Sequence, residues 1–316
     1  MRMRNAPVYR SLVIRANLEE QHIIQTYRLN RQMIMVLVTQ SEPDLLPAIR
    51  HPSAIPPTAQ VLSVLHFLAS GSFQIIVGLA KGMSQPMFIN VLRDALLQYV
   101  RSYIRFSNRA DVATVNAAFY DLAHVPHVIE ATDGTHIALV PPRRSEEVYR
   151  NRKNFYFTNV QVVCLADQYI TQVTARFPGS VHDSYIPWNS TVQRDRAWLI
   201  GDSGYPNLPW LLTPMRHPTT AVEYTYNEAH GRTRRVVERT LGLLMTRFRC
   251  LHISGGAILC TPQKVCQIIV ACCMLHNLTL RHHIPLLDAE EVGSDDEEDN
   301  EDAVASRGEL IRQYLH

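Results

Sequence analysis

The spacing of apolar and polar residues along the chain divides it into five segments. A helical period runs through an N-terminal helical segment, residues 1–55, and through a second helical region, residues 56–120. Beyond HVPHVIEA the period becomes that of strands, and residues 121–287 mix strands with helices. Residues 288–302 form an acidic run without aromatic residues that we expect to be disordered, and residues 303–316 form a C-terminal tail. The pattern therefore predicts a folded α/β chain with its helical part first.

The second helical region has the outline of a helix-turn-helix. Thr58 can cap a first helix that ends at Gly71, and Ser84 can cap a longer helix with Pro86 in its first turn. A short helical piece around FQIIVGL and a KGM turn lie between them. The apolar face of the first helix consists of Val61, Leu62, Leu65 and Leu68. That of the second consists of Phe88, Val91, Leu92, Ala95, Leu96 and Tyr99. A plain helical bundle would produce the same pattern.

In a helix-turn-helix the start of the second helix meets the base edges of DNA. The polar or adaptable residues at that position are Gln85, Met87, Asn90 and Arg93. We therefore expect Asn90 and Arg93 to contact DNA if this region binds it.

Strand-like patterns then follow in the order of a known fold. VIEATDGTHIALV predicts a first strand, and NVQVVCLAD and YITQVTARFPG predict two more, joined at Asp167 and Gln168 as an antiparallel meander. HDSYIPWNSTVQ predicts a helix, AWLIGDSGYP a buried strand that ends at Asp202, and residues 228–249 a long helix. This order predicts a ribonuclease H-like catalytic core with a mixed five-stranded sheet and helices, preceded by the helix-turn-helix-like region.

Four acidic residues fall in or beside these apolar elements. Asp133 lies in the middle of the first strand, Asp202 at the end of a later strand, and Asp183 in the first turn of a helix. Glu238 lies beside the stripe of apolar residues on the long helix, which consists of Val237, Leu241, Leu244 and Phe248. A carboxylate in an apolar strand is costly unless it is paired or bound to metal, so this pattern favours a divalent-metal site.

Two divalent ions can stabilise both the attacking and the leaving oxygen of a phosphoryl displacement, which requires carboxylates from several elements. We expect Asp133, Asp202 and Glu238 to be catalytic metal ligands, with Asp183 as a further ligand for Mg²⁺ or Mn²⁺. Each has an ordinary structural alternative. Asp133 can form a DG turn, Asp183 can cap its helix, Asp202 can form the GDSG turn, and Glu238 can be a surface residue paired with Arg234.

Charge adds a nucleic-acid hypothesis. The net charge is only +2, but ten of the acidic residues lie in 288–302, so the rest of the chain carries about +12. Only three of the basic residues are lysines, and arginine suits bidentate contacts with phosphate, although gene composition can also enrich arginine. The candidate phosphate contacts are Arg150, Arg152 and Lys153 in a basic loop, and Arg234, Arg235 and Arg239 around Glu238.

Other compositional signals point away from competing classes. The six cysteines form no CxxC pair and lie mostly in apolar surroundings, which predicts buried reduced thiols. The histidines lack HxxxH or HExxH spacing, so a zinc hydrolase is not expected. The apolar stretches are too short or too polar for a bilayer, and the N-terminus lacks an apolar signal core, so we expect a soluble intracellular protein with no membrane partner.

Together, several motifs resemble the PIF/Harbinger superfamily of DDE transposases. They are DGTH at 133–136, HDS at 182–184, LIGDSGY at 199–205, YNEAHGRTRRVVERTLGLLMTRFRCL at 226–251, and the late ACCMLHN. The resemblance covers about residues 56–280. It implies a divalent-metal nuclease with the acids Asp133, Asp202 and Glu238, and Asp183 as a further acid. It also implies DNA substrates, a Myb-like DNA-binding partner that assists nuclear import, and a location in nucleus and cytoplasm.

The sequence therefore predicts a metal-dependent DNA nuclease or transposase, for which we also consider a homo-oligomer. A catalytically silent DNA-binding or scaffold protein that works with the Myb-like partner is the main alternative. A small-molecule phosphohydrolase is disfavoured, because Asp133 is followed by Gly134 and Thr135 where an Asp-x-Asp pair would be needed.

Overall fold

The structure is a computed structural model, and it forms two compact units. It describes residues 19–46, 54–72, 85–105, 112–141, 146–150, 156–178, 197–206 and 208–286. The helical unit comprises residues 1–100, 245–258 and 278–316. The sheet unit comprises residues 101–244 and 259–277.

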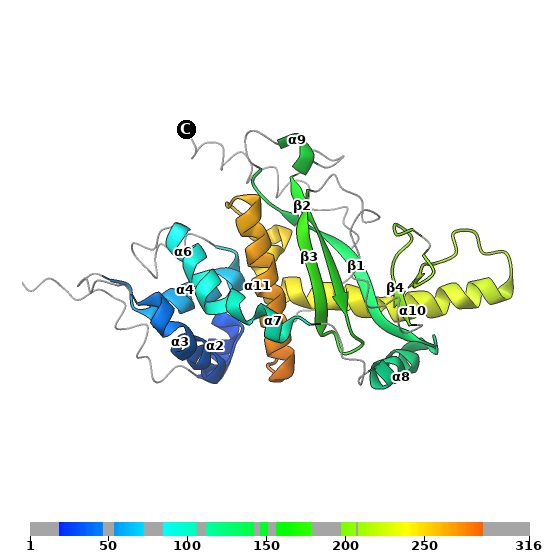
Figure 1. The fold of residues 1–316 in the computed structure, drawn as a ribbon, viewed down its shortest axis with the longest axis horizontal. Coiled ribbons are helices and arrows are strands. Elements are labelled where there is room, and N and C mark those ends of the chain that lie inside the picture. Colours follow the sequence, from blue (N-terminus) through cyan, green and yellow to red (C-terminus); the bar gives the residue numbers. More distant parts are fainter. Residues whose placement is uncertain are drawn as a thin grey trace, which may run out of the picture. The chain divides into compact units, whose positions relative to one another are not determined.

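Packed short helices build the helical unit (Figure 1). They are α2 (Glu20–Tyr27), α3 (Arg31–Leu45), α4 (Pro57–Ser70), α6 (Gln85–Val91), the π-helical turn η1 (Leu92–Leu96), and the 3₁₀ turns η2 (Leu97–Tyr99), η6 (Arg249–Leu251) and η7 (Ile253–Gly255). Asn30 caps α3 by accepting a hydrogen bond from the Met33 N–H at 2.9 Å. Phe67 of α4 and Phe88 of α6 meet edge to face with their ring centroids 5.1 Å apart. The ring contact packs α4 against α6 in the apolar core of this unit.

The boundaries of α4 correct one prediction and confirm another. The helix begins at Pro57 after Pro56, so Thr58 is not its cap; proline suits the first helical position because it needs no donor there. The helix ends at Gly71, whose φ of 73° is left-handed and whose N–H bonds to the Phe67 carbonyl at 2.8 Å. This C-terminus is the one predicted.

The second predicted helix begins at Gln85, and its predicted face is buried at Phe88, Val91, Leu92, Ala95 and Leu96. It does not stay α-helical, because it continues through the π-helical η1 and the 3₁₀ η2 before α7 (Val100–Tyr103). The FQIIVGL piece, the KGM turn and Ser84 lie outside the described residues. The helix-turn-helix therefore stays a prediction.

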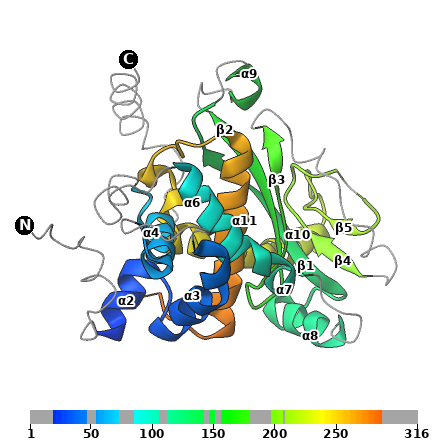
Figure 2. The ribbon, with the colours of Figure 1, turned by 60° about the vertical axis from the view of Figure 1, so that its left-hand side comes forward.

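The sheet unit contains a mixed five-stranded sheet in the order β3-β2-β1-β4-β5 (Figures 1 and 2). Its strands are β1 (Val128–Ala138), β2 (Phe157–Cys164), β3 (Ile170–Pro178), β4 (Trp198–Ile200) and β5 (Leu211–Leu212). β1, β2 and β3 form an antiparallel meander, and β4 and β5 run parallel to β1. The chain turns from β2 to β3 at Asp167 and at Gln168, whose φ is 69°. The predicted ribonuclease H-like fold and the meander are confirmed.

The other helices of this part of the chain are α8 (Val112–Ala123), α9 (Glu146–Tyr149), α10 (Ala221–Arg247) and α11 (Pro262–Arg281). Both views show α10 crossing one face of the sheet, where Val236 and Val237 pack against Val128, Ala131 and Ile200 (Figures 1 and 2). The same cluster takes in Phe119 of α8. For this reason residues 101–120, which the sequence pattern groups with the helical region, lie in the sheet unit.

α10 begins seven residues earlier than the predicted helix over 228–249. Thr220 and Glu223 form a capping box at its start. The Glu223 carboxylate accepts from the N–H groups of Thr219 and Thr220 at 2.6 and 3.0 Å, and the Thr220 hydroxyl accepts from the Glu223 N–H at 3.3 Å. The TAVE motif was the available signal. The helix predicted from HDSYIPWNSTVQ lies outside the described residues.

α11 contacts the edge strand β3, and the Cys266 thiol donates to the Ala175 carbonyl. The helix is long and apolar enough to cross a membrane, but 67% of its most apolar window is buried inside the protein, as in the core helix of a soluble protein. None of the six cysteines, all of which the structure describes, forms a disulfide; five are buried and Cys266 is half-buried. The prediction that they pack as reduced thiols is confirmed.

Candidate active site

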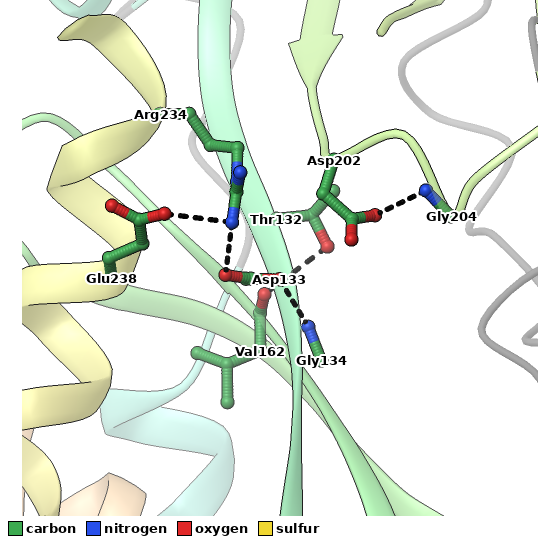
Figure 3. A network of polar contacts seen from close by, with 8 residues as sticks. All are labelled: Thr132, Asp133, Gly134, Val162, Asp202, Gly204, Arg234 and Glu238. Atoms are coloured by element: carbon green, nitrogen blue, oxygen red, sulfur yellow. Dashed lines mark hydrogen bonds and ion pairs between the residues drawn. The ribbon is translucent and has the colours of Figure 1, made fainter. Parts of the chain in front are cut away.

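Strand register brings Asp133 and Asp202 together. Ala131 of β1 pairs with Ile200 of the parallel strand β4. Side chains two residues apart on a strand point to the same face of the sheet. Asp133, two residues after Ala131, therefore lies beside Asp202, two residues after Ile200, although β4 itself ends at Ile200. Figure 3 shows both carboxylates at this point of the sheet, and the negative charge of Asp202 contributes to raising the pKa of Asp133.

Asp133 lies in the middle of β1 and does not form the DG turn, because the strand continues to Ala138. Its side chain is 14% exposed. One oxygen, Oδ1, accepts from the Gly134 N–H at 2.9 Å, and Oδ2 accepts from Arg234 Nη2 at 3.3 Å. Burial raises the pKa of Asp133 to about 6, and the charge of Arg234 opposes this shift while that of Asp202 adds to it. The site therefore contains a carboxylate that is costly to ionise even beside the guanidinium of Arg234.

Asp202 follows β4 in the GDSG turn. Its Oδ1 accepts from the Gly204 N–H at 3.1 Å, so the turn role considered as an alternative is present. A Cβ at Gly204 would lie 3.2 Å from this oxygen, which shows how closely the turn wraps the carboxylate. Oδ2 accepts no hydrogen bond from the part of the chain that the structure describes. The turn orients Asp202 and leaves one oxygen for another ligand.

Glu238 and Arg234 are one turn apart on α10, beside the buried Val237. Arg234 Nη2 donates to Glu238 Oε1 at 2.8 Å and to Asp133 Oδ2 at 3.3 Å, as Figure 3 shows. The side chain of Glu238 is 47% exposed and that of Arg234 is 26% exposed. The ion pair considered as the alternative for Glu238 is therefore present. It is part of a bridge, because one guanidinium nitrogen joins the helix carboxylate to the strand carboxylate.

The chemistry of these donors suits a hard divalent cation. Asp133, Asp202 and Glu238 offer only carboxylate oxygens, which Mg²⁺ and Mn²⁺ prefer. Among the described residues, however, no three His, Cys, Asp or Glu side chains form a ready group for a metal ion. Arg234 lies between two of the acids, Asp133 and Glu238. The donor set fits a divalent metal, provided that Arg234 gives up its contacts with the carboxylates.

The remaining predicted site residues of this unit are either exposed or outside the described residues. Asp183, Arg152 and Lys153 lie outside the described residues, so their roles stay predictions. Arg235 and Arg239 are exposed on α10 in the same part of the helix as Glu238, and Arg150 is exposed after α9.

In the helical unit, Asn90 is exposed on α6, and Arg93 is paired with its neighbour Asp94 at 2.6 Å. Met87 packs against Ile55 and Ala59, so it belongs to a small apolar cluster. These residues lie in the unit that does not contain Asp133.

Glu130 is a buried acid that sequence reasoning missed. Glu130 is 1% exposed, and both of its carboxyl oxygens are buried without a hydrogen bond from a described residue. The nearby Thr171 hydroxyl donates instead to the Val163 carbonyl at 3.3 Å. Burial raises the pKa of Glu130 to about 8, so the group is protonated at neutral pH. The rule that identified Asp133, an acid inside an apolar strand, applies equally to the E of VIEAT.

The sheet order, with acids on β1, after β4 and on α10, agrees with the fold of a DDE endonuclease. Residues 132–277 match the family described as DDE superfamily endonuclease. The chain belongs to the Harbinger transposase-derived nucleases, which confirms the resemblance. It is 34% identical over 312 residues to "Putative nuclease HARBI1" of Rattus norvegicus, across 94% of this chain and 89% of the relative.

Two further relatives extend the comparison. "Putative nuclease HARBI1" of Homo sapiens is 33% identical over 312 residues, with the same coverage of 94% and 89%. "Protein ALP1-like" of Arabidopsis thaliana is 27% identical over 248 residues, across 70% of this chain and 60% of the relative. No solved structure matches the chain.

Proposed function

We propose that this chain hydrolyses DNA phosphodiester bonds, or transfers a cut strand, in a reaction that depends on Mg²⁺ or Mn²⁺. The observation that carries the proposal is the register of β1 and β4, from which Asp133 lies beside Asp202. Glu238 of α10 is joined to Asp133 through Arg234. Three carboxylates from three elements are the donor set that two-metal phosphoryl transfer needs. Membership of a nuclease family supports the same reaction class.

In this proposal the acidic side chains bind the metal, and backbone N–H groups orient two of them. Asp133, Asp202 and Glu238 would hold the metal, and Asp183 is the further ligand that the resemblance implies. When bound, the metal supplies Lewis-acid stabilisation of the charge that develops on the phosphate oxygens. The Gly134 N–H orients Asp133 and the Gly204 N–H orients Asp202, so both carboxylates are held by backbone donors.

Arginine side chains around Glu238 supply phosphate contacts in this proposal. Arg235 and Arg239 are exposed on α10, and the net charge of about +12 outside residues 288–302 favours a polyanionic substrate. Arg152 and Lys153 are further candidates. The same proposal includes a Myb-like DNA-binding partner, a location in nucleus and cytoplasm, and assembly as a homo-oligomer.

A nicking assay tests this function. Purified protein with Mn²⁺ is expected to convert supercoiled plasmid to the nicked form, and Asp133→Asn and Asp202→Asn are expected to reduce the rate at least a hundredfold, since each removes a ligand charge without changing side-chain size. Asp121→Asn, at an exposed position of α8, is the matched control and keeps the wild-type rate. Equal nicking by all three variants would sink the assignment.

A catalytically silent DNA-binding or scaffold protein is the second candidate. The observation in its favour is that Arg234 already forms ion pairs with Asp133 and Glu238, at 3.3 and 2.8 Å. Calorimetry separates the two functions. DNA binding without any Mg²⁺ or Mn²⁺ binding, in protein that is shown to be folded, supports the scaffold; metal binding that Asp133→Asn abolishes supports the nuclease.

A further inference from the structure

We propose that Arg234 has two alternating partners, the carboxylates of the metal-free site and a DNA phosphate in the metal-loaded site, and thereby couples metal binding to DNA binding. This inference rests on the proposed nuclease function, because it assigns a role to a residue inside that site. It goes beyond that function by predicting that each ligand strengthens the binding of the other.

Arg234 occupies a position that a metal ion would need. Its Nη2 atom contacts Asp133 Oδ2 and Glu238 Oε1, two oxygens that a divalent cation would need. The charge of Asp202 also acts on Arg234. Two like charges within a few ångströms repel strongly in a partly buried site. A divalent cation therefore has to displace the guanidinium before it can use both oxygens.

Few of the hydrogen-bond donors of Arg234 hold it in this position. Both of its ion pairs use one nitrogen, Nη2, and Nε is buried and donates no hydrogen bond to a described residue. A guanidinium has five donors, so most of its capacity is unused in this position. The side chain is 26% exposed and carries a long flexible stem, which allows it to turn outward from α10.

A displaced Arg234 would lie near other exposed arginines of α10. Arg235 and Arg239 are exposed on the same helix, so an outward Arg234 would join a basic surface next to the carboxylates. Guanidinium groups bind phosphate oxygens in pairs through parallel hydrogen bonds. Metal entry would release Arg234 to a phosphate of bound DNA, and a DNA phosphate would draw Arg234 away from the carboxylates and so favour metal entry.

Linkage makes this proposal quantitative. If Mn²⁺ tightens DNA binding through Arg234, DNA must tighten Mn²⁺ binding by the same factor, which for typical couplings is about tenfold. Arg234→Gln removes the internal cation. It is therefore expected to bind Mn²⁺ several-fold more tightly than wild type in the absence of DNA, and to lose most of the coupling.

The experiment combines two titrations on the full chain. Calorimetry gives the Mn²⁺ affinity with and without a short duplex, and fluorescence anisotropy gives the affinity for that duplex with and without Mn²⁺, with gels to verify that the DNA stays intact. Arg235→Gln is the matched control, because Arg235 is exposed on the neighbouring position of α10. It is expected to weaken DNA binding equally with and without Mn²⁺ and to leave Mn²⁺ affinity unchanged. Thermal melts show whether each variant is folded.

The outcomes distinguish this inference from the proposed function. Tighter Mn²⁺ binding by Arg234→Gln, together with reduced coupling, supports the two roles of Arg234. If wild type binds Mn²⁺ and Asp133→Asn does not, but Arg234→Gln binds it no more tightly or keeps the full coupling, the nuclease site stands and the inference is overturned. If neither wild type nor Arg234→Gln binds Mn²⁺, with or without DNA, the proposed function fails and the inference fails with it.

Discussion

The side chain of Asn277 in α11 pairs with the backbone of Ile170 as a neighbouring strand would. Its Oδ1 accepts from the Ile170 N–H at 2.8 Å, and its Nδ2 donates to the Ile170 carbonyl at 2.6 Å and to the Tyr103 carbonyl at 2.8 Å. Ile170 begins β3, the strand at one edge of the sheet. Asn277 is fully buried, so it closes this edge where water does not reach.

We expect Asn277→Ala to lower the free energy of unfolding by about 3 kcal/mol, because it removes three hydrogen bonds and leaves buried backbone groups unsatisfied. Asn227 provides a matched control: it makes the same pair of bonds with the backbone of Met215, at 2.8 and 2.9 Å, at an exposed site. Asn227→Ala should cost about 1 kcal/mol or less, since water replaces its bonds. Urea denaturation measures both; an equal cost would show that burial of Asn277 is unimportant.

Glu130 makes the stability of the protein depend on pH. The ordinary glutamate pKa is 4.5, and burial raises that of Glu130 to about 8 in the folded protein. Between these values the unfolded chain is ionised while the folded protein keeps the proton. The free energy of unfolding therefore falls by about 1.4 kcal/mol per pH unit from this group as pH rises, and the loss is complete above pH 8.

Glu130→Gln removes this titration and keeps the size of the protonated side chain. At pH 5 the variant should lie within about 1 kcal/mol of wild type, and at pH 8 it should be more stable by on the order of 3 kcal/mol. Thermal or urea denaturation at a series of pH values makes the comparison. Glu228→Gln, at an exposed position of α10, should leave the pH profile unchanged. Parallel profiles for wild type and Glu130→Gln would mean that Glu130 is ionised or solvated in the folded protein.

The sequence predicted the elements with a clear period and missed those set by contacts far along the chain. The alternation in β1 and the apolar stripe of α10 were sufficient to place Asp133 on a strand and Glu238 beside the core. A five-stranded sheet was predicted, but its fifth strand, β5, was not located, because two residues carry no recognisable period. The sequence predicted that Arg234 can pair with Glu238, because the two residues are four positions apart on one helix. Its contact with Asp133, 101 residues away, required the fold.

Two glycines should respond to alanine in opposite directions. Gly255 in η7 lies directly against the Arg249 carbonyl, and an added Cβ would overlap that backbone oxygen. Gly255→Ala should therefore lower the free energy of unfolding by about 2 kcal/mol or more. Gly231 is exposed inside α10, with nothing within 4 Å of an added Cβ. Gly231→Ala should stabilise the protein by about 0.5 to 1 kcal/mol through helix propensity. Denaturation midpoints test both, and stabilisation by Gly255→Ala would contradict the packing of η7.

Asp133 should show a conflict between stability and function. Burial raises its pKa from 3.8 to about 6 in the metal-free protein, so at pH 7 the folded state carries an ionised group that it disfavours. This cost appears above about pH 4 and is complete above about pH 6, because the unfolded chain ionises first.

Without metal at pH 7, Asp133→Asn should therefore raise the free energy of unfolding by on the order of 2 kcal/mol, and near pH 4 the difference should vanish. The amide oxygen can still accept from the Gly134 N–H, and Arg234 keeps its bond to Glu238. Added Mn²⁺ should raise the melting temperature of wild type and leave that of Asp133→Asn unchanged, since binding to the native state alone stabilises it. Asp121→Asn is the control for a simple loss of negative charge. A metal-free Asp133→Asn that is less stable than wild type at pH 7 would show that the pair with Arg234 outweighs the cost of burial.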